Sequence, residues 1–274
     1  MFFWRKLFPY LQKSIPRNRN NQLLKILDKV STTYHSLYEN LNYDCEYNGE
    51  LFLLNKLNQS NNLNCIFDVG ANIGNYSLLA REINKQCLIF AFEPVPKTYI
   101  DLKENVLNKD IKTFNIGLGS DTREEMMLVS KDSKLSTLLL ENSNLSTKDN
   151  PQYVSVKIIS GDEFLKNNNE LNQISLLKID TEGYESEVLK GFRRIMPKVN
   201  IIQFEYGKAN LFSKYFLKDY FNDYSDDYYI GKLYPNGVEF FEKYKWDLDD
   251  LIGPNYVMVK RSRKDLYALL SIKV

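Results

Sequence analysis

Short apolar runs alternate with segments of helical periodicity through most of the chain, starting near residue 65. The runs typical of buried strands lie at residues 65–69, 88–92, 111–118, 174–179 and 199–204. The segments with helical spacing between them lie at residues 75–83, 96–108, 162–166 and 183–195. Strands that alternate with helices favour parallel pairing, because each helix returns the chain to the same edge of the sheet. The pattern predicts an α/β fold with a doubly wound, mostly parallel sheet.

The segments outside this alternation define the rest of the organisation. Residues 19–60 carry apolar residues at helical spacing, which predicts a helical lead-in. We therefore expect a helical N-terminal extension at 1–47 and a main domain at 48–274. A polar stretch at 132–150 is interpreted as a loop over the site. Additional strand-like runs lie at residues 126–130, 154–159, 228–233 and 256–260.

Charge and cysteine content narrow the class of protein. The chain has 36 basic and 35 acidic residues, and a net charge of +1 does not favour a nucleic-acid partner. The three cysteines lie far apart and form no metal-binding pair, which indicates a reducing, cytoplasmic location. The single histidine, His35, excludes a zinc site built from several histidines.

The N-terminal ten residues are aromatic and basic, and two interpretations of them stay open. No apolar stretch approaches the ~20 residues that a membrane-spanning helix needs. We favour a segment packed on the main domain, and the alternative is peripheral contact with a membrane surface.

The candidate ligand site lies where the predicted parallel strands end, because ligands of open α/β sheets bind beyond those carboxyl ends. After the first strand, Gly70 and Gly74 remove side chains where a ligand must approach the backbone. Asn75 is a suitable N-cap for the following helix, whose free amides then face the pocket. Glu93 ends the second strand and is able to accept both hydroxyls of a ribose. These features predict a cofactor that contains adenosine.

The missing glycines decide which cofactor fits best. A dinucleotide fingerprint needs glycine at its first, third and sixth positions, which here hold Gly70, Asn72 and Asn75. S-adenosylmethionine has no phosphate, and the carboxylate of Asp68 suits its amino group but repels a pyrophosphate. Asn115 is expected to line the adenine, on its position alone.

Three sequence blocks resemble the FkbM family of methyltransferases. They are residues 67–77 (FDVGANIGNYS), 91–94 (AFEP) and 177–185 (LKIDTEGYE), and the resemblance covers roughly residues 48–260. The resemblance implies a class I, Rossmann-like methyltransferase fold. It also implies methyl transfer from S-adenosylmethionine, commonly to an oxygen of a sugar or secondary metabolite. The implied partner is a small-molecule or glycan acceptor, whose identity does not carry over.

Carboxylates are the natural candidates for acid–base chemistry, since an alcohol needs help to become a nucleophile. Our hypothesis is that Asp180 or Glu205 accepts the acceptor's proton, with Lys178 and Glu182 arranging the site. The alternative is structural: Asp180 caps the following helix and Glu182 lies in its first turn. The same carboxylates suit Mg²⁺, but oxygen ligands alone do not establish a metal, and no metal site is predicted.

Three rival functions stay open at this point. A nicotinamide-dependent oxidoreductase requires the dinucleotide fingerprint that the turn lacks. A non-catalytic binding protein on the same fold is compatible with donor binding but not with turnover. Methylation of RNA is disfavoured by the near-neutral charge.

Overall fold

A computed structural model describes residues 2–129, 152–168, 171–253 and 255–273 of the chain. It divides the chain into two compact units, Met1–Leu41 and Asn42–Val274. Residues 42–47, which we expected in the N-terminal extension, belong to the second unit. The expected loop at 132–150 lies outside the described residues.

The N-terminal unit consists of two helices, α1 (Phe2–Arg17) and α2 (Gln22–Tyr38). The side chain of Asn21 caps α2 by accepting hydrogen bonds from the amides of Leu23 and Leu24. No helix among the described residues combines the length and apolar character needed to cross a membrane.

The second unit is built on an eight-stranded sheet with the order β10-β9-β11-β8-β7-β1-β2-β3. Strands β3, β2, β1, β7 and β8 are parallel, and β11 is antiparallel to both of its neighbours, β8 and β9. This is the expected doubly wound, mostly parallel sheet of the class I, Rossmann-like fold. The strands span Cys65–Val69 (β1), Leu88–Phe92 (β2), Lys112–Phe114 (β3), Ile174–Ile179 (β7), Val199–Glu205 (β8), Tyr228–Tyr234 (β9), Gly237–Phe241 (β10) and Asn255–Lys260 (β11).

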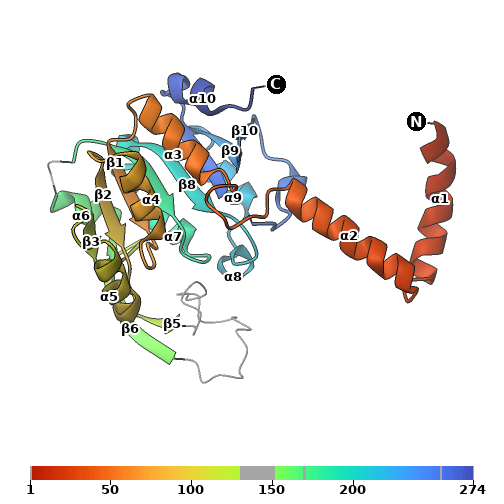
Figure 1. Ribbon diagram of the computed structural model, residues 1–274, viewed down its shortest axis with the longest axis horizontal. Helices are drawn as coiled ribbons and strands as arrows, with labels where there is room; N and C mark the ends of the chain where they lie inside the picture. Colours follow the sequence, from red (N-terminus) through yellow and green to blue (C-terminus); the bar gives the residue numbers. More distant parts are fainter. Residues whose placement is uncertain (1, 130–151, 169–170, 254, 274) are drawn as a thin grey trace. The chain divides into compact units, whose positions relative to one another are not determined.

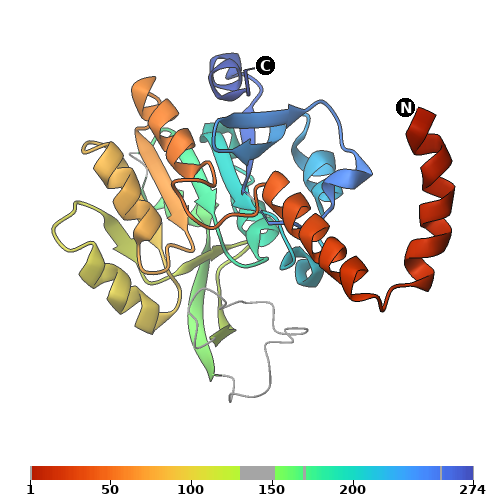
Figure 2. The same ribbon diagram turned by 45° about the vertical axis from the view of Figure 1, so that its right-hand side comes forward.

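Helices cover both faces of this sheet, because successive strand residues alternate between two apolar clusters. Phe67 faces one cluster with residues of α6, α7 and α9, and Ile66 faces the other with residues of α3, α4 and α10. Helices α3 and α4 lie side by side over the second face (Figure 2). The helices span Glu50–Gln59 (α3), Asn75–Ile83 (α4), Pro96–Asn105 (α5), Gly161–Lys166 (α6), Glu185–Lys190 (α7), Asn210–Ser213 (α8), Leu217–Tyr224 (α9) and Lys264–Leu270 (α10).

A second sheet corrects one expectation. The run at 111–118, predicted as a single strand, forms β3 and then β4 (Gly117–Gly119), and the two strands lie in different sheets. Strand β4 pairs with β6 (Gln152–Ser160), which also pairs with β5 (Arg123–Val129). The helix expected at 183–195 is also shorter than predicted. Helix α7 spans Glu185–Lys190, and turns follow at residues 191–195. Apolar spacing predicts burial, and it does not show where a strand changes partner.

Candidate active site

The turn after β1 brings the backbone against the end of the neighbouring strand β7. Val69 is paired with Ile179, and the amide of Asp180 donates a 3.0 Å hydrogen bond to the carbonyl of Val69. Gly70 has a φ of +79°, and a Cβ built on it would lie 1.9 Å from the carbonyl oxygen of Asp180. Only glycine fits here, because the backbone of Asp180 occupies the space that a side chain would need. The expected approach of a ligand at Gly70 stays a prediction.

Gly74 occupies the N-cap position of α4 that we had predicted for Asn75. It has a φ of +91° and occupies the cap position of α4, where it has no side chain to accept an amide hydrogen bond. Asn75, which we expected as the N-cap, is instead the first helical residue and is exposed. The first-turn amides of α4 therefore have no side-chain cap, and their hydrogen atoms stay available to a ligand.

Glu93 joins the turn after β1 to the loop after β2. Its two carboxylate oxygens accept hydrogen bonds from the backbone amides of Asn72, at 3.0 Å, and Val95, at 2.9 Å. Burial raises the pKa of Glu93 to about 7, although these two amides act in the opposite direction. Each oxygen keeps a second lone pair. The carboxylate thus fixes Asn72, which has a left-handed φ of +49°, and retains capacity for a ligand.

Asn115 lies between β3 and β4 and supports the same loop. Its side-chain amide donates to the backbone carbonyls of Glu93, at 2.9 Å, and Pro94, at 3.0 Å. The contacts show how this exposed residue holds the segment that carries Glu93. A role in lining an adenine stays a prediction.

Asp68 is placed differently from the expectation that it meets the donor's amino group. Its side chain has no exposed surface. One carboxylate oxygen accepts a 2.7 Å hydrogen bond from the hydroxyl of Ser77, and the other lies 3.4 Å from the ammonium of Lys178. The carboxylate ties β1 to α4 and β7 from inside the protein, because both of its oxygens face these partners.

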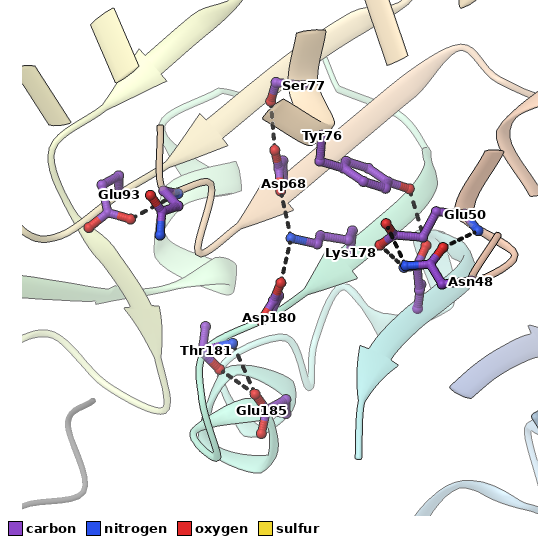
Figure 3. Close-up of polar contacts among 12 residues, drawn as sticks. Asn48, Glu50, Asp68, Tyr76, Ser77, Glu93, Lys178, Asp180, Thr181 and Glu185 are labelled. Atoms are coloured by element: carbon purple, nitrogen blue, oxygen red, sulfur yellow. Dashed lines mark hydrogen bonds and ion pairs between the residues drawn. The ribbon is translucent and has the colours of Figure 1, made fainter. Parts of the chain in front are cut away.

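Lys178 lies between Asp68 and Asp180 (Figure 3). Its ammonium is 3.2 Å from the carboxylate of Asp180 and 5.1 Å from the centre of the Tyr76 ring. Burial lowers the pKa of this buried lysine, but the carboxylates of Asp180, Asp68 and Glu50 together raise it above its usual value. Lys178 is therefore a fixed cation beneath the strand ends.

A polar network behind Lys178 was not found from the sequence. Gln203 on β8 donates to the carboxylate of Glu50, at 2.8 Å, and accepts from the hydroxyl of Tyr76, at 3.1 Å. Asn48 donates to the other oxygen of Glu50, at 3.1 Å (Figure 3). Tyr76 falls in the first sequence block, but Glu50 precedes the whole alternating pattern, and nothing in the sequence connects it to Lys178.

Asp180, Glu182 and Glu205 gather at the ends of β7 and β8. One carboxylate oxygen from each lies within 4.8 Å of the others. Burial, followed by the charges of Asp180 and Glu182, raises the pKa of Glu205 well above its usual value, and a hydrogen bond with Asp180 acts in the same direction. These neighbours favour the protonated form of Glu205. The side chain of Asp180 is 40% exposed, so this carboxylate is open to a ligand.

Buried Glu185 shapes the loop that carries this cluster. One of its carboxylate oxygens accepts hydrogen bonds from the amide of Thr181, the hydroxyl of Thr181 and the amide of Gly183 (Figure 3). Within this loop Glu182 has a left-handed φ of +53° and Gly183 one of +99°. The last glutamate of the third sequence block thus holds the loop closed, a role that we did not assign from the sequence.

The chain is similar to known methyltransferases over the part that contains this site. The family model described as "Methyltransferase FkbM domain" matches residues 68–228, a range that includes the turn after β1, Glu93 and the acidic cluster. The hexuronic acid methyltransferase AglP of Haloferax volcanii is 30% identical over 139 residues, and methyltransferase 1 of Beauveria bassiana is 30% identical over 151 residues. These matches cover 50% and 46% of this chain and 53% and 57% of the two relatives.

A solved structure is also similar. The methyltransferase FkbM of Methylobacillus flagellatus has 16% identity and a TM-score of 0.43, with coverage of 72% of this chain and 44% of that one. The chain spans little more than half the length of the curated relatives it matches. The family match itself extends over more than half of this chain, and the chain therefore belongs to the FkbM methyltransferase domain family.

Proposed function

We propose that this protein is an S-adenosylmethionine-dependent O-methyltransferase that acts on a hydroxyl of a sugar, glycan or secondary metabolite. One observation carries the proposal. The glycine turn after β1 abuts the backbone of Asp180, the residue that follows β7, and the side chain of this residue is 40% exposed, so we place a donor held at the turn near this carboxylate. This arrangement suits a reaction in which the acceptor oxygen receives the methyl group of the donor and gives its proton to a nearby carboxylate.

The residues at the turn fit a phosphate-free adenosine. Gly70 and Gly74 allow the left-handed backbone and the close packing of the turn, and Glu93 retains one lone pair on each oxygen for the two ribose hydroxyls. The buried carboxylates of Asp68 and Glu93 disfavour a pyrophosphate in the same place. We propose Gly70, Asn72, Gly74, Asn75 and Glu93 as donor-binding residues, with Asp68 and Asn115 as positioning residues. When bound, S-adenosylmethionine supplies an electrophilic methyl group.

The proposed proton acceptor is Asp180. Its side chain is 40% exposed, whereas burial and the neighbouring carboxylates raise the pKa of Glu205 and so favour the protonated form of that group. Asp180 takes the proton from the acceptor hydroxyl as the new carbon–oxygen bond forms and the methyl–sulfur bond breaks, with S-adenosylhomocysteine as the leaving group. Lys178 donates a hydrogen bond to the carboxylate of Asp180 and so fixes its position, and Glu182 is the third carboxylate of the cluster. Most of the rate enhancement is expected from alignment of donor and acceptor, an effect worth up to roughly 7–11 kcal/mol.

The name of one relative supports a carbohydrate acceptor. The Haloferax protein is a hexuronic acid methyltransferase, and its match covers 50% of this chain. We therefore propose a hydroxyl of a uronic acid or a related glycan unit as the first acceptor to test. A nucleic-acid acceptor is not proposed, because the chain has a net charge of only +1. The three free thiols are in keeping with a cytoplasmic location, which we also propose.

The acidic cluster also resembles a site for a hard cation such as Mg²⁺. Three carboxylates within 4.8 Å of one another offer the oxygen ligands that such an ion takes. The reaction proposed here uses Asp180 as a base and requires no metal, so turnover is expected to survive a chelator.

Calorimetry with S-adenosylhomocysteine, followed by turnover assays, tests the proposal. We expect binding of this product, no binding of NAD, and transfer of a labelled methyl group to oligosaccharides that contain uronic acids. Donor binding without turnover on a broad set of hydroxyl acceptors would favour the non-catalytic alternative. Binding of NAD in place of S-adenosylhomocysteine would establish the nicotinamide alternative and refute the proposal.

A further inference from the structure

The two units of the chain differ sharply in charge. Residues 1–41 contain seven basic and two acidic residues, whereas residues 42–274 contain 29 basic and 33 acidic residues. No acidic residue occurs before Asp28. A basic excess confined to a short helical unit suits contact with an anionic surface.

Helix α2 presents a continuous apolar face along its whole length. No residue of α2 is buried, and seven of its large apolar side chains are between 54% and 69% exposed. These exposed residues, which share one side of the helix at three- and four-residue spacing, are Leu23, Ile26, Leu27, Val30, Tyr34, Leu37 and Tyr38. The opposite side carries Lys25, Asp28 and Lys29. A wide apolar face of this kind normally lies against an apolar environment.

Helix α1 (red in Figure 1) repeats the arrangement with a more basic polar side. Phe8 and Ile15 are 47% and 46% exposed and share one side of the helix with Leu11. Lys13 and Arg17 lie on the other side and are also exposed. A helix with lysine and arginine on one side and aromatic and aliphatic residues on the other is typical of segments that lie in the plane of a membrane surface.

We propose that the N-terminal unit, residues 1–41, binds the surface of an anionic membrane with the apolar sides of α1 and α2 in the boundary between headgroups and acyl chains. A membrane accounts for both features of the unit, because its interior accepts the apolar faces and its phosphates attract the basic residues. A second copy of the same unit would bring like charges together. No helix needs to span the bilayer, in agreement with the absence of a spanning helix among the described residues.

Co-sedimentation of the full chain with vesicles tests this inference. We expect binding to vesicles of phosphatidylcholine mixed with phosphatidylglycerol, weak binding to phosphatidylcholine alone, and release in concentrated salt. The double variant K13E/R17E should lower the partition constant on anionic vesicles by at least about thirtyfold, since each basic residue near such a surface contributes a factor of about five. The control K103E/K109E makes the same charge change at exposed sites of the second unit.

A second variant tests the exposed apolar face of α2. L27D/V30D changes the exposed face of α2 and should also abolish vesicle binding, while circular dichroism and affinity for S-adenosylhomocysteine report on the fold of the second unit. Equal binding of the wild type and K13E/R17E would overturn the proposal, as would absence of binding to anionic vesicles. A concentration-dependent dimer in sedimentation velocity, lost in L27D/V30D and unaccompanied by vesicle binding, would assign the face to self-association instead.

Discussion

The two halves of the candidate site use the same kind of side chain in opposite ways. On the donor side, every oxygen of Asp68 and Glu93 faces a hydroxyl, an ammonium or a backbone amide. On the acceptor side, Asp180, Glu182 and Glu205 lie with their carboxylates within 4.8 Å of one another, and burial and the charges of the other two raise the pKa of Glu205.

The difference separates carboxylates that hold the protein together from carboxylates that are free to react. A carboxylate whose oxygens are all matched by donors is held in one position by them. Crowded carboxylates raise one another's pKa, so one of them binds a proton more readily. Lys178 stands between the halves, because it contacts Asp68 on one side and Asp180 on the other.

The largest effect is expected from Asp180→Asn, which removes the reactive carboxylate of the acceptor side. We expect turnover to fall by about 100- to 10,000-fold, because the amide does not accept the proton. Affinity for S-adenosylhomocysteine, measured by calorimetry, should stay within about threefold if Asp180 acts only in the chemical step. The exposed Asp226→Asn serves as the control. Unchanged turnover in Asp180→Asn would remove Asp180 from the mechanism.

Lys178→Met tests the cation that joins the two halves. The substitution leaves the buried Asp68 without its ammonium, and loss of one partner of a buried ion pair typically destabilises a protein by about 3–5 kcal/mol. We expect a loss of this size in the free energy of unfolding measured with denaturant. Lys103→Met, at an exposed position, should have little effect. A loss no larger than that of the control would show that Asp68 does not depend on Lys178.

Gly70→Ala sharpens the comparison on the donor side. The new methyl group would meet the backbone carbonyl of Asp180, and the left-handed φ alone disfavours alanine by about 1–2 kcal/mol. We expect a destabilisation of at least about 2 kcal/mol together with loss of S-adenosylhomocysteine binding. Gly207→Ala is the matched control, because its nearest neighbour, the Cα of Gly253, lies 3.3 Å from the added methyl group. Equal stability and affinity of the two variants would contradict the close approach at Gly70.

The smallest effect concerns the proton on Glu205. Its pKa is raised in the folded protein, so its contribution to stability is fully present below the unfolded value of about 4.5 and is lost as pH rises through the folded pKa. Glu205→Gln abolishes this dependence. Relative to the wild type, we expect the variant to gain at least about 1 kcal/mol in unfolding free energy between about pH 5 and about pH 8. Glu104→Gln, at an exposed site, should follow the wild type, and a variant of Glu205 that did the same would show that this carboxyl is ionised throughout.

Much of the scaffold could be predicted because its signals are local. The bounds expected for β1, β2, β7 and α4 agree with the structure, since each strand is a short, mainly apolar run followed by a glycine or an acidic residue, and α4 has clear helical spacing. The family resemblance is confirmed on the same blocks. The division of β3 from β4 was missed, because the apolar pattern continues across Asn115 while the strand partners change.

The sequence by itself determined the fold class, the family and the strand ends at which polar residues meet, because strand periodicity, turn glycines and short motifs are written in neighbouring positions. The tertiary structure decided how each carboxylate is used. Asp68 and Asp180 are both acidic residues at the ends of parallel strands, yet the first is sealed beside Ser77 and Lys178 and the second is exposed. The surroundings of a side chain come from residues distant in the chain. Glu50, which is held by Gln203, raises the pKa of Lys178, and the sequence does not show that these residues meet.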